Sequence, residues 1–209
     1  MTIAFQRLRG IYAIVNEGSH DPVALVRALL DGGIRIFQYR AKNGIVLERL
    51  QAIREVTRER NALLIVNDDW NAARDLGADG AHVGPDDATP QELPKIRKHM
   101  QGLLLGVSCG TIEESRQAQL AGADYIGVGA VYATGSKADA GAPIGIAGLQ
   151  RVAAATTLPV AAIGGISIDT IEDVAASGVA MAAVLCALAT PSNPAAAAER
   201  FVNLWNGAT

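Results

Sequence analysis

The chain has 209 residues, of which 50% are hydrophobic and 4% aromatic, and its formal net charge is −3. That length can bury one sizeable core, so we expect a single domain over residues 1–209. A mildly acidic chain is a poor nucleic-acid binder, and any cationic site in it should be local and suited to a small anion.

Short β-rich runs alternate with amphipathic helical segments along the whole chain. The predicted strands are residues 10–16, 34–40, 63–68, 80–84, 103–108, 125–129, 160–165 and 180–186. The segments between them, such as 21–33, 47–60 and 111–123, carry apolar residues at helical spacing and often end in glycine. This alternation predicts a parallel sheet, and eight βα units favour a closed (β/α)₈ TIM barrel over an open doubly wound sheet.

Three further features of the chain bear on its class. A last helix should begin near Pro194, with Ser192 or Asn193 as its cap. Cys109 and Cys186 have neither disulfide-framework nor zinc-site spacing, so both thiols should be free. No apolar run is long enough for a signal peptide or a membrane span, which predicts a cytoplasmic protein without a membrane partner. The sequence leaves a homo-oligomer open.

Polar residues gather where the predicted strands end, which is the end of a TIM barrel that carries active sites. Gln38 and Arg40 share one face of the second strand, and Lys42 follows just beyond it. The other polar residues at these ends are Asn67, Asp68, Asp69, Asp86, Asp87, Ser108, Thr134, Ser136 and Lys137. Taken singly, a charged strand end can simply be fraying into solvent, and the acidic pairs can be helix caps.

Cations and carboxylates on one rim favour a bound polyanion accompanied by a metal ion. Oxygen ligands without a cluster of histidines or cysteines predict Mg²⁺, which uses one or two carboxylates together with substrate phosphates. None of the three histidines, His20, His82 and His99, has the surroundings of a zinc ligand. The glycines of "IGGI", residues 163–166, indicate either a turn or a close approach of the backbone to a phosphate.

Six short motifs, one for each of six barrel strands, together resemble the thiamine-phosphate synthase family. In chain order they are "QYRAK", "VND", "HVGPDD", "GVS", "GAVYATGSK" and "AIGGI". The resemblance runs over nearly the whole chain, from "GIYAIV" to "VLCA". It implies a transferase that joins hydroxymethylpyrimidine diphosphate, 4-amino-2-methyl-5-(diphosphooxymethyl)pyrimidine, to a thiazole phosphate, giving thiamine phosphate and pyrophosphate. The carbon–oxygen bond would break first, leaving a carbocation that the thiazole nitrogen captures.

The resemblance also implies roles for individual residues. The pyrimidine diphosphate would be held by Gln38, Tyr39, Arg40, Ala41, Lys42, Asn67, Ser108 and Lys137. Of these, Arg40, Lys42, Ser108 and Lys137 would be catalytic, and Asp68 and Asp87 would bind Mg²⁺. The thiazole phosphate would be held by Thr134, Gly135, Ser136 and Gly165, and by the backbone around Leu185 and Cys186 at the end of the eighth strand.

The chain departs from the family pattern at several positions. Pro85 stands where glutamine is common, Ser136 where threonine is common, and Cys186 where serine is usual. Gly110 replaces a frequent histidine, and "VNEG" after the first strand replaces a Thr-Asp ending.

Three other functions are compatible with such a barrel. A thiazole tautomerase tends to lack the metal carboxylates and to use a histidine near position 110, whereas this chain has Asp68 and Asp87 and has Gly110. A non-catalytic barrel could bind a phosphorylated metabolite and act through a partner. A sugar-phosphate isomerase is supported only by the generic "IGGI" site.

Overall fold

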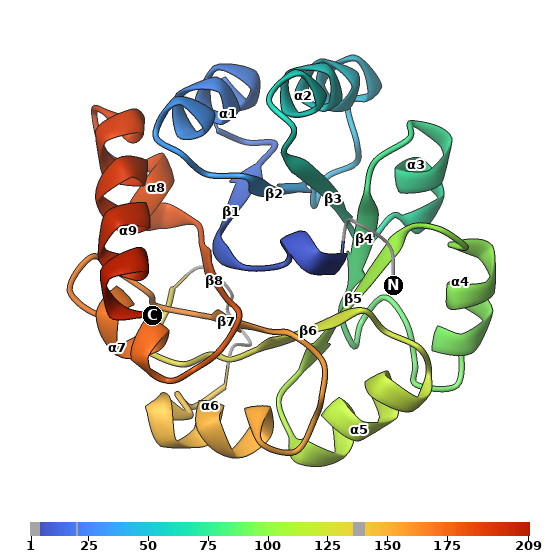
Figure 1. The fold of residues 1–209 in the computed structure, drawn as a ribbon. Coiled ribbons are helices and arrows are strands. Elements are labelled where there is room, and N and C mark those ends of the chain that lie inside the picture. The colour runs from blue at the N-terminus through green and yellow to red at the C-terminus, as the bar shows by residue number, and fades with distance from the viewer. Residues whose placement is uncertain (1–4, 20, 136–140) are drawn as a thin grey trace.

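The protein is a closed parallel barrel of eight strands in chain order, as Figure 1 shows along the barrel axis. The computed structural model describes residues 5–19, 21–135 and 141–209. The strands are β1 (Gly10–Asn16), β2 (Ile36–Arg40), β3 (Leu63–Asn67), β4 (Gly80–Val83), β5 (Leu104–Cys109), β6 (Tyr125–Val128), β7 (Val160–Ile163) and β8 (Met181–Val184). Pairing of β1 with β8 closes the ring, so the predicted (β/α)₈ barrel is confirmed.

Helices form the outer layer of the barrel. They are α1 (Pro22–Asp31), α2 (Leu47–Glu59), α3 (Trp70–Asp75), α4 (Leu93–His99), α5 (Ile112–Leu120), α6 (Gly145–Ala153), α7 (Ile171–Ala176), α8 (Cys186–Ala189) and α9 (Pro194–Ala208), with a short 3₁₀ helix η1 (Phe5–Arg7) before β1. None of the described helices has the length and apolar character needed to cross a bilayer.

Helix starts follow local capping chemistry that the sequence carries. Asp21 accepts hydrogen bonds from the amides of Val23 and Ala24, both at 3.0 Å, and so satisfies two free N–H groups at the start of α1. Thr111 and Glu114 form a capping box at the start of α5. Asn193 accepts from Ala196 N at 3.1 Å, which makes it the cap of α9.

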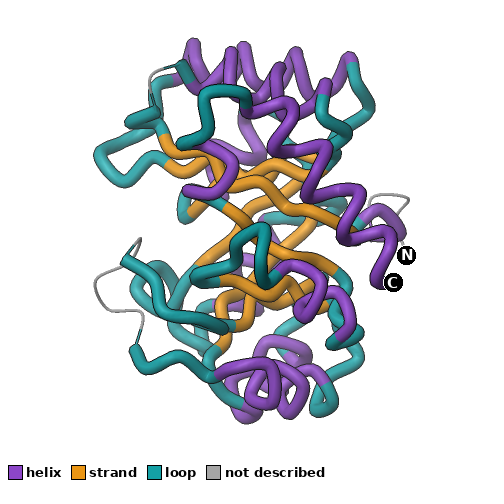
Figure 2. The backbone as a smooth tube through the Cα atoms, turned by 90° about the vertical axis from the view of Figure 1, so that its left-hand side faces the viewer, coloured by secondary structure: helices purple, strands orange, loops and turns teal. Residues whose placement is uncertain are grey.

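Two hydrophobic cores result from the alternation of side chains along each strand. One set of strand residues packs against the helices, with Phe37, Leu64 and Ile126 among its buried members. The other set fills the barrel interior and includes Ile36 and Leu63. Figure 2 shows the resulting layers from the side, with the strands enclosed between helices.

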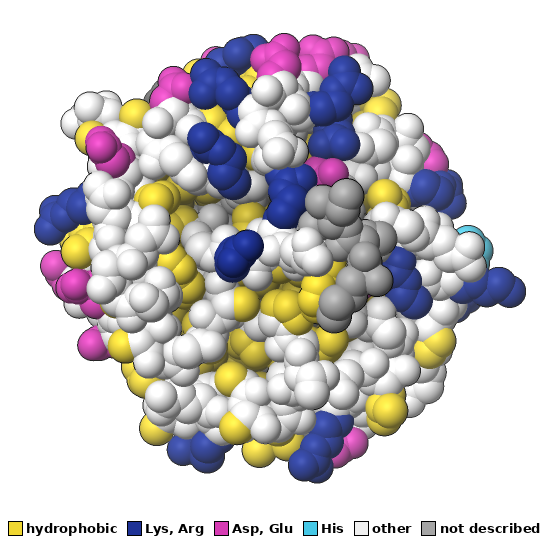
Figure 3. All heavy atoms as spheres, in the orientation of Figure 1, with side chains coloured by type: hydrophobic (Ala, Val, Ile, Leu, Met, Phe, Trp, Pro, Cys, Tyr) yellow, Lys and Arg dark blue, Asp and Glu magenta, His cyan; other side chains and the backbone are white. Residues whose placement is uncertain are grey.

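The two ends of the barrel are covered by different segments of the protein. The described N-terminal segment and the end of α9 lie at the end where the strands begin, which is the right-hand side of Figure 2. Figure 3 shows this face, where Lys and Arg side chains lie over a hollow with hydrophobic walls. A small cavity here is lined by Arg9, Arg35, Val202 and Trp205 among others. The predicted site residues lie at the opposite end.

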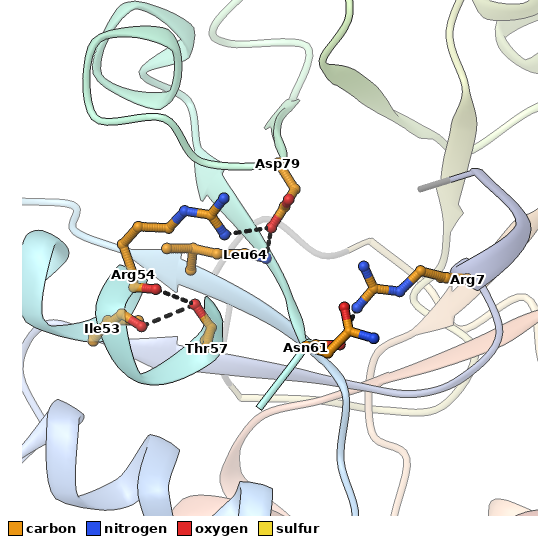
Figure 4. Close-up of polar contacts among 7 residues, drawn as sticks. All are labelled: Arg7, Ile53, Arg54, Thr57, Asn61, Leu64 and Asp79. Atoms are coloured by element: carbon orange, nitrogen blue, oxygen red, sulfur yellow. Dashed lines mark hydrogen bonds and ion pairs between the residues drawn. The ribbon is translucent and has the colours of Figure 1, made fainter. Parts of the chain in front are cut away.

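Asp79 and Asp124 make equivalent contacts where β4 and β6 begin. Asp79 Oδ2 accepts from Leu64 N at 2.8 Å and lies 2.9 Å from Arg54 Nη1, as Figure 4 shows. Asp124 Oδ2 accepts from Leu105 N at 2.8 Å and lies 2.7 Å from Nη1 of Arg97, which is on α4. The two aspartates lie in similar stretches of the sequence, "LGADGAHVG" and "AGADYIGVG", so this local similarity corresponds to a repeated structural contact.

Candidate active site

The predicted polar residues on strands converge at the ends of β2, β3 and β5. Strand register places Arg40 opposite Asn16, Asn67 opposite His82, and Ser108 opposite Gly127. Because neighbouring strands of a parallel barrel all end at the same rim, residues distant in sequence meet there. The rim therefore combines amide, hydroxyl, guanidinium and carboxylate groups.

Arg40 is held by a residue that the sequence analysis did not select. Its Nη1 donates a hydrogen bond to Oδ1 of Asn16 over 3.2 Å. Asn16 is the last residue of β1 and is half-buried. The sequence feature that could have identified Asn16 is its position as a polar residue at a predicted strand end. It lies in the "VNEG" stretch, which departs from the family pattern.

Tyr39 and Ala41 point away from the rim. Tyr39 alternates with Gln38 and Arg40, is 1% exposed, and donates its hydroxyl hydrogen bond to Glu17, which also pairs with Arg49. Burial and the hydrogen bond to Glu17 both raise the pKa of the Tyr39 hydroxyl. Ala41 packs against the outer core. Any contact that these two positions make with a rim ligand would therefore go through their backbone atoms.

Lys42 lies beyond the end of β2 but its side chain returns to the rim. Its Nζ is 3.3 Å from Oδ2 of Asp68, and half of the Lys42 side chain is exposed. Asp68 follows β3 and has a positive φ of 65°, a conformation that aspartate tolerates better than most residues. Its backbone N–H donates to the carbonyl of His82 over 2.8 Å, which fixes this bend at the strand end.

Asp68 and Asp87 form a carboxylate pair. Burial raises the pKa of Asp68 above its ordinary value, and Asp87 raises it further through a hydrogen bond and through charge repulsion, whereas Lys42 lowers it. Asp87 also accepts from Gly84 N at 2.9 Å. Two adjacent carboxylates that repel each other suit a bound divalent cation. Within the described residues, no third His, Cys, Asp or Glu joins them in a metal-binding group.

Asp69 has a structural role instead. Its Oδ1 accepts from Ala72 N at 2.9 Å, which makes it the N-cap of α3. The alternative of a helix cap, which the sequence left open for each acidic residue at the rim, therefore holds for Asp69.

A chain of hydrogen bonds crosses the barrel interior below the rim. Its successive distances are 2.8 Å from Gln38 Nε2 to the Tyr12 hydroxyl, 2.9 Å from that hydroxyl to that of Tyr125, 3.1 Å from the Tyr125 hydroxyl to His82 Nδ1, and 3.0 Å from His82 Nε2 to Ser108 Oγ. Its two ends, Gln38 and Ser108, are residues that the sequence predicted for the site. From the sequence, His82 was rejected as a zinc ligand and given no other role, and neither tyrosine was selected.

Burial is the largest influence on the pKa values of the three residues in the middle of this series of hydrogen bonds. It lowers the pKa of His82 to about 4 and raises the pKa values of the Tyr12 and Tyr125 hydroxyls. The imidazole is therefore neutral at neutral pH, and both tyrosines are protonated.

The loops after β6 and β7 pack against each other. Val131 N donates to Ile163 O at 2.9 Å, and Tyr132 N donates to Gly164 O at 3.0 Å. Gly165 has a φ of +64°, and a Cβ there would lie 2.4 Å from Ala133 O, so only glycine fits. Exposed Gly135 and half-buried Thr134 lie on the same loop. Two predicted residues further along it, Ser136 and Lys137, lie outside the described residues.

Leu185 and Cys186 lie beyond β8, which ends at Val184. The prediction of a strand up to residue 186 was wrong at this end, because Leu185 is the N-cap and Cys186 the first residue of α8. Neither cysteine forms a disulfide with another described residue, as predicted: Cys186 is exposed, while Cys109 is buried and burial raises its pKa to about 12.

The chain is similar to known proteins over nearly its whole length. The model of the thiamine monophosphate synthase family matches residues 11–188. A thiamine-phosphate synthase from Moorella thermoacetica is 43% identical over 198 residues, which cover 91% of this chain and 93% of that protein. One from Herpetosiphon aurantiacus is 42% identical, covering 92% of this chain and 94% of that protein.

Solved structures show the same relationship. A thiamine phosphate pyrophosphorylase from Pyrococcus furiosus superimposes with a TM-score of 0.89 at 31% identity, covering 96% of this chain and 97% of that one. A 3-hexulose-6-phosphate synthase from Salmonella typhimurium has a TM-score of 0.77 at 18% identity, over 96% of this chain and 100% of that one, and shares the fold alone. The chain therefore belongs to the thiamine monophosphate synthase family, which confirms the predicted function of a transferase in thiamine biosynthesis.

Proposed function

We propose that the rim of this barrel binds hydroxymethylpyrimidine diphosphate and a thiazole phosphate side by side and joins them into thiamine phosphate. The observation that carries the proposal is the convergence of Lys42 with the carboxylates of Asp68 and Asp87 beside Arg40 and its partner Asn16. Cations and a carboxylate pair at one rim suit a diphosphate that arrives with a divalent metal ion.

The diphosphate would lie over the end of β2. The guanidinium of Arg40 can donate two parallel hydrogen bonds to phosphate oxygens, whereas Lys42 acts as a compact charge on a longer stem. Asn67, at the end of β3, and Lys137 would complete this half of the site. Gln38 and Ser108 stand below it and would contact the pyrimidine ring.

Asp68 and Asp87 would hold Mg²⁺. The fit rests on their adjacency, because the repulsion that raises the pKa of Asp68 is relieved when a cation lies between the carboxylates. When bound, the ion would neutralise charge on the diphosphate oxygens. Lys42, which contacts Asp68, could then turn its ammonium toward the diphosphate.

The thiazole phosphate would lie over the loops after β6 and β7, opposite β2. Gly135 and Gly165 are exposed there, so that their backbone N–H groups would be able to bind a phosphate, and Thr134 and Ser136 would contribute hydroxyls. Loops after the seventh and eighth strands, with a short extra helix, form phosphate sites in many TIM barrels. The position of α8, with Leu185 and Cys186 at its start, is consistent with that arrangement.

The chemistry requires charge stabilisation and the exclusion of water. The bond between the pyrimidine methylene carbon and the diphosphate oxygen breaks, and its electron pair leaves with pyrophosphate. The lone pair of the thiazole nitrogen then forms the new carbon–nitrogen bond, and no proton has to move. Arg40, Lys42 and Lys137 would stabilise the negative charge on the leaving group, so an acid–base residue is unnecessary.

Tautomerase activity is the main alternative. The carboxylate pair at Asp68 and Asp87 argues for the synthase, as does Gly110 in the place of a histidine. We further propose that the chain is one cytoplasmic domain that takes these small molecules as its only substrates. A homo-oligomer is compatible with all of these features.

The test is direct. Purified protein is incubated with hydroxymethylpyrimidine diphosphate, thiazole phosphate and Mg²⁺, and thiamine phosphate is followed by thiochrome fluorescence, with EDTA as the control. Metal-dependent product with one pyrophosphate released for each thiamine phosphate is the expected result. A folded protein that binds thiazole phosphate and releases no pyrophosphate would contradict the synthase proposal, and isomerisation of the thiazole would then identify a tautomerase.

A further inference from the structure

The hydrogen-bonded chain that joins Gln38 to Ser108 runs through three residues that lie below the rim, namely Tyr12, Tyr125 and His82. All three are buried, with exposed fractions of 2%, 0% and 8% in that order. A buried polar network in a barrel core is costly unless each member is satisfied, so its presence calls for a role. Packing alone would be served by apolar residues.

The available donors and acceptors fix which group donates in each hydrogen bond from Gln38 to Ser108. The Nε2 amide of Gln38 can only donate, so the Tyr12 hydroxyl accepts from it. The proton of Tyr12 must then go to its other partner, the hydroxyl of Tyr125. Tyr125 in turn has only one acceptor left, which is Nδ1 of His82. The imidazole proton is therefore on Nε2.

The two side chains at the ends of this hydrogen-bonded series, Gln38 and Ser108, consequently have opposite roles. His82 Nε2 donates to Ser108 Oγ, so the proton of Ser108 is directed away from the imidazole and toward the rim. Ser108 is itself exposed. At the other end, Gln38 uses its nitrogen on Tyr12, and its Oε1 accepts no hydrogen bond from the described residues. These two side chains therefore present one donor, at Ser108, and one acceptor, at Gln38.

Two glycines leave the space that the hydrogen-bonded side chains of Tyr125 and His82 occupy. A Cβ on Gly106 would lie 2.2 Å from the Tyr125 ring and 2.5 Å from His82 Nδ1, distances at which the two side chains could no longer meet. A Cβ on Gly127 would lie 3.1 Å from His82 Cε1. Glycine at these positions of β5 and β6 thus leaves the imidazole ring the space to bridge Tyr125 and Ser108.

We propose that Tyr12, Tyr125 and His82 are positioning residues that set the donor role of Ser108 and the acceptor role of Gln38, so that the pocket selects a 4-aminopyrimidine over its 4-oxo counterpart. The inference rests on the proposed function, in which Gln38 and Ser108 contact the pyrimidine. The 4-amino group is a donor beside an acceptor ring nitrogen, which matches Gln38 and Ser108 respectively. The 4-oxo ring has a carbonyl beside a ring N–H, so both of its contacts would be mismatched.

The size of the effect follows from the cost of unpaired groups. A site that hydrogen-bonds its substrate rejects a mismatched analogue by roughly 10²- to 10⁴-fold. Tyr125→Phe removes the link that forces the imidazole proton onto Nε2. The proton can then occupy either nitrogen, and Ser108 can donate to His82 instead of to the ring.

The experiment compares kcat/KM for the 4-amino and 4-oxo pyrimidine diphosphates, each with thiazole phosphate and Mg²⁺. The unaltered protein should prefer the amino substrate by at least about 100-fold, and Tyr125→Phe should reduce that preference by roughly tenfold or more. Tyr132→Phe is the matched control, because the Tyr132 hydroxyl is buried and has no hydrogen-bond partner within the described part of the chain. It should keep the full preference.

A second measurement does not depend on catalysis. Nitrogen-15 NMR of the substrate-free protein should show His82 protonated on Nε2, and a mixture of tautomers in Tyr125→Phe. Protonation on Nδ1 in the unaltered protein would overturn the inference even if the variant failed to fold.

The outcomes separate this inference from the function beneath it. If the unaltered protein makes no thiamine phosphate from the 4-amino substrate, the proposed function fails and the inference fails with it. If the unaltered protein turns over normally and Tyr125→Phe keeps the same preference, only the inference fails.

Discussion

The ammonium of Lys42 lies 3.3 Å from the carboxylate of Asp68. One residue was expected to hold a diphosphate and the other a metal ion, yet in the described structure they contact each other. Both are partly exposed, with side-chain fractions of 50% and 29%, so the pair adds little to stability. In the proposed function, this weak contact would be exchanged for a metal ion at Asp68 and a phosphate at Lys42 when substrate binds.

Removing either rim carboxylate should abolish metal-dependent turnover. Asp68→Ala and Asp87→Ala are each expected to lower the Mg²⁺-dependent rate by on the order of 10²-fold or more, since a carboxylate ligand is lost. Asp69→Ser is the control, because it removes a neighbouring charge but keeps an N-cap acceptor for α3. Full activity of Asp68→Ala, measured at saturating Mg²⁺, would mean that the metal binds elsewhere.

The two substrates should respond differently to loss of Arg40. Arg40→Ala removes charge-assisted hydrogen bonds to the diphosphate, and we expect its binding to weaken by roughly 10- to 100-fold. Thiazole phosphate should bind as before. Asn16→Ala, which releases Arg40 from its 3.2 Å partner, should have a smaller effect of the same kind. Calorimetry with each ligand alone measures this, and equal weakening of both would place Arg40 between the subsites.

His82 should make the folded state sensitive to acid. Burial lowers its pKa in the folded protein to about 4 from an ordinary value of 6.5. As the pH falls below 6.5 the unfolded chain takes up a proton that the folded chain refuses, so stability is lost until the pH reaches about 4. The loss attributable to this residue is roughly 3 kcal/mol at 1.36 kcal/mol per pKa unit.

Urea unfolding of the protein and of His82→Asn at pH 7 and pH 4.5 checks this. The free energy of unfolding should fall more steeply with acid in the unaltered protein, because the variant has no imidazole to protonate. Parallel losses in both proteins would assign the acid sensitivity to other groups.

Asp124 should be important for stability rather than for activity. Its carboxylate receives both Leu105 N and the guanidinium of Arg97, so Asp124→Ala leaves a backbone donor and a partly buried cation without their partner. We expect a loss of about 1–3 kcal/mol in the free energy of unfolding. Asp75→Ala removes an exposed pair with Arg74 and should change stability by less than about 0.5 kcal/mol. Denaturant curves of the two variants give the comparison.

The sequence by itself determined the architecture and the end of the barrel at which the candidate site lies. Apolar strand runs, helical spacing and glycine at helix ends are local signals, and they predicted all eight strands to within a few residues. Because parallel strands share one end, the order of the motifs was enough to bring Gln38, Arg40, Asn67 and Ser108 to one rim. The local rules could not place the end of β8, where Leu185 already caps a helix.

Tertiary structure alone decided which polar groups meet. Asp68 and Asp69 are neighbours of identical chemistry, but the positive φ of Asp68 directs it to Lys42 while Asp69 caps α3. Tyr12 and Tyr125 are 113 positions apart and meet only because the barrel closes. Hydrogen bonds across a barrel depend on register, on the tilt of strands and on the space that glycines leave, and none of these is a property of a local stretch of sequence.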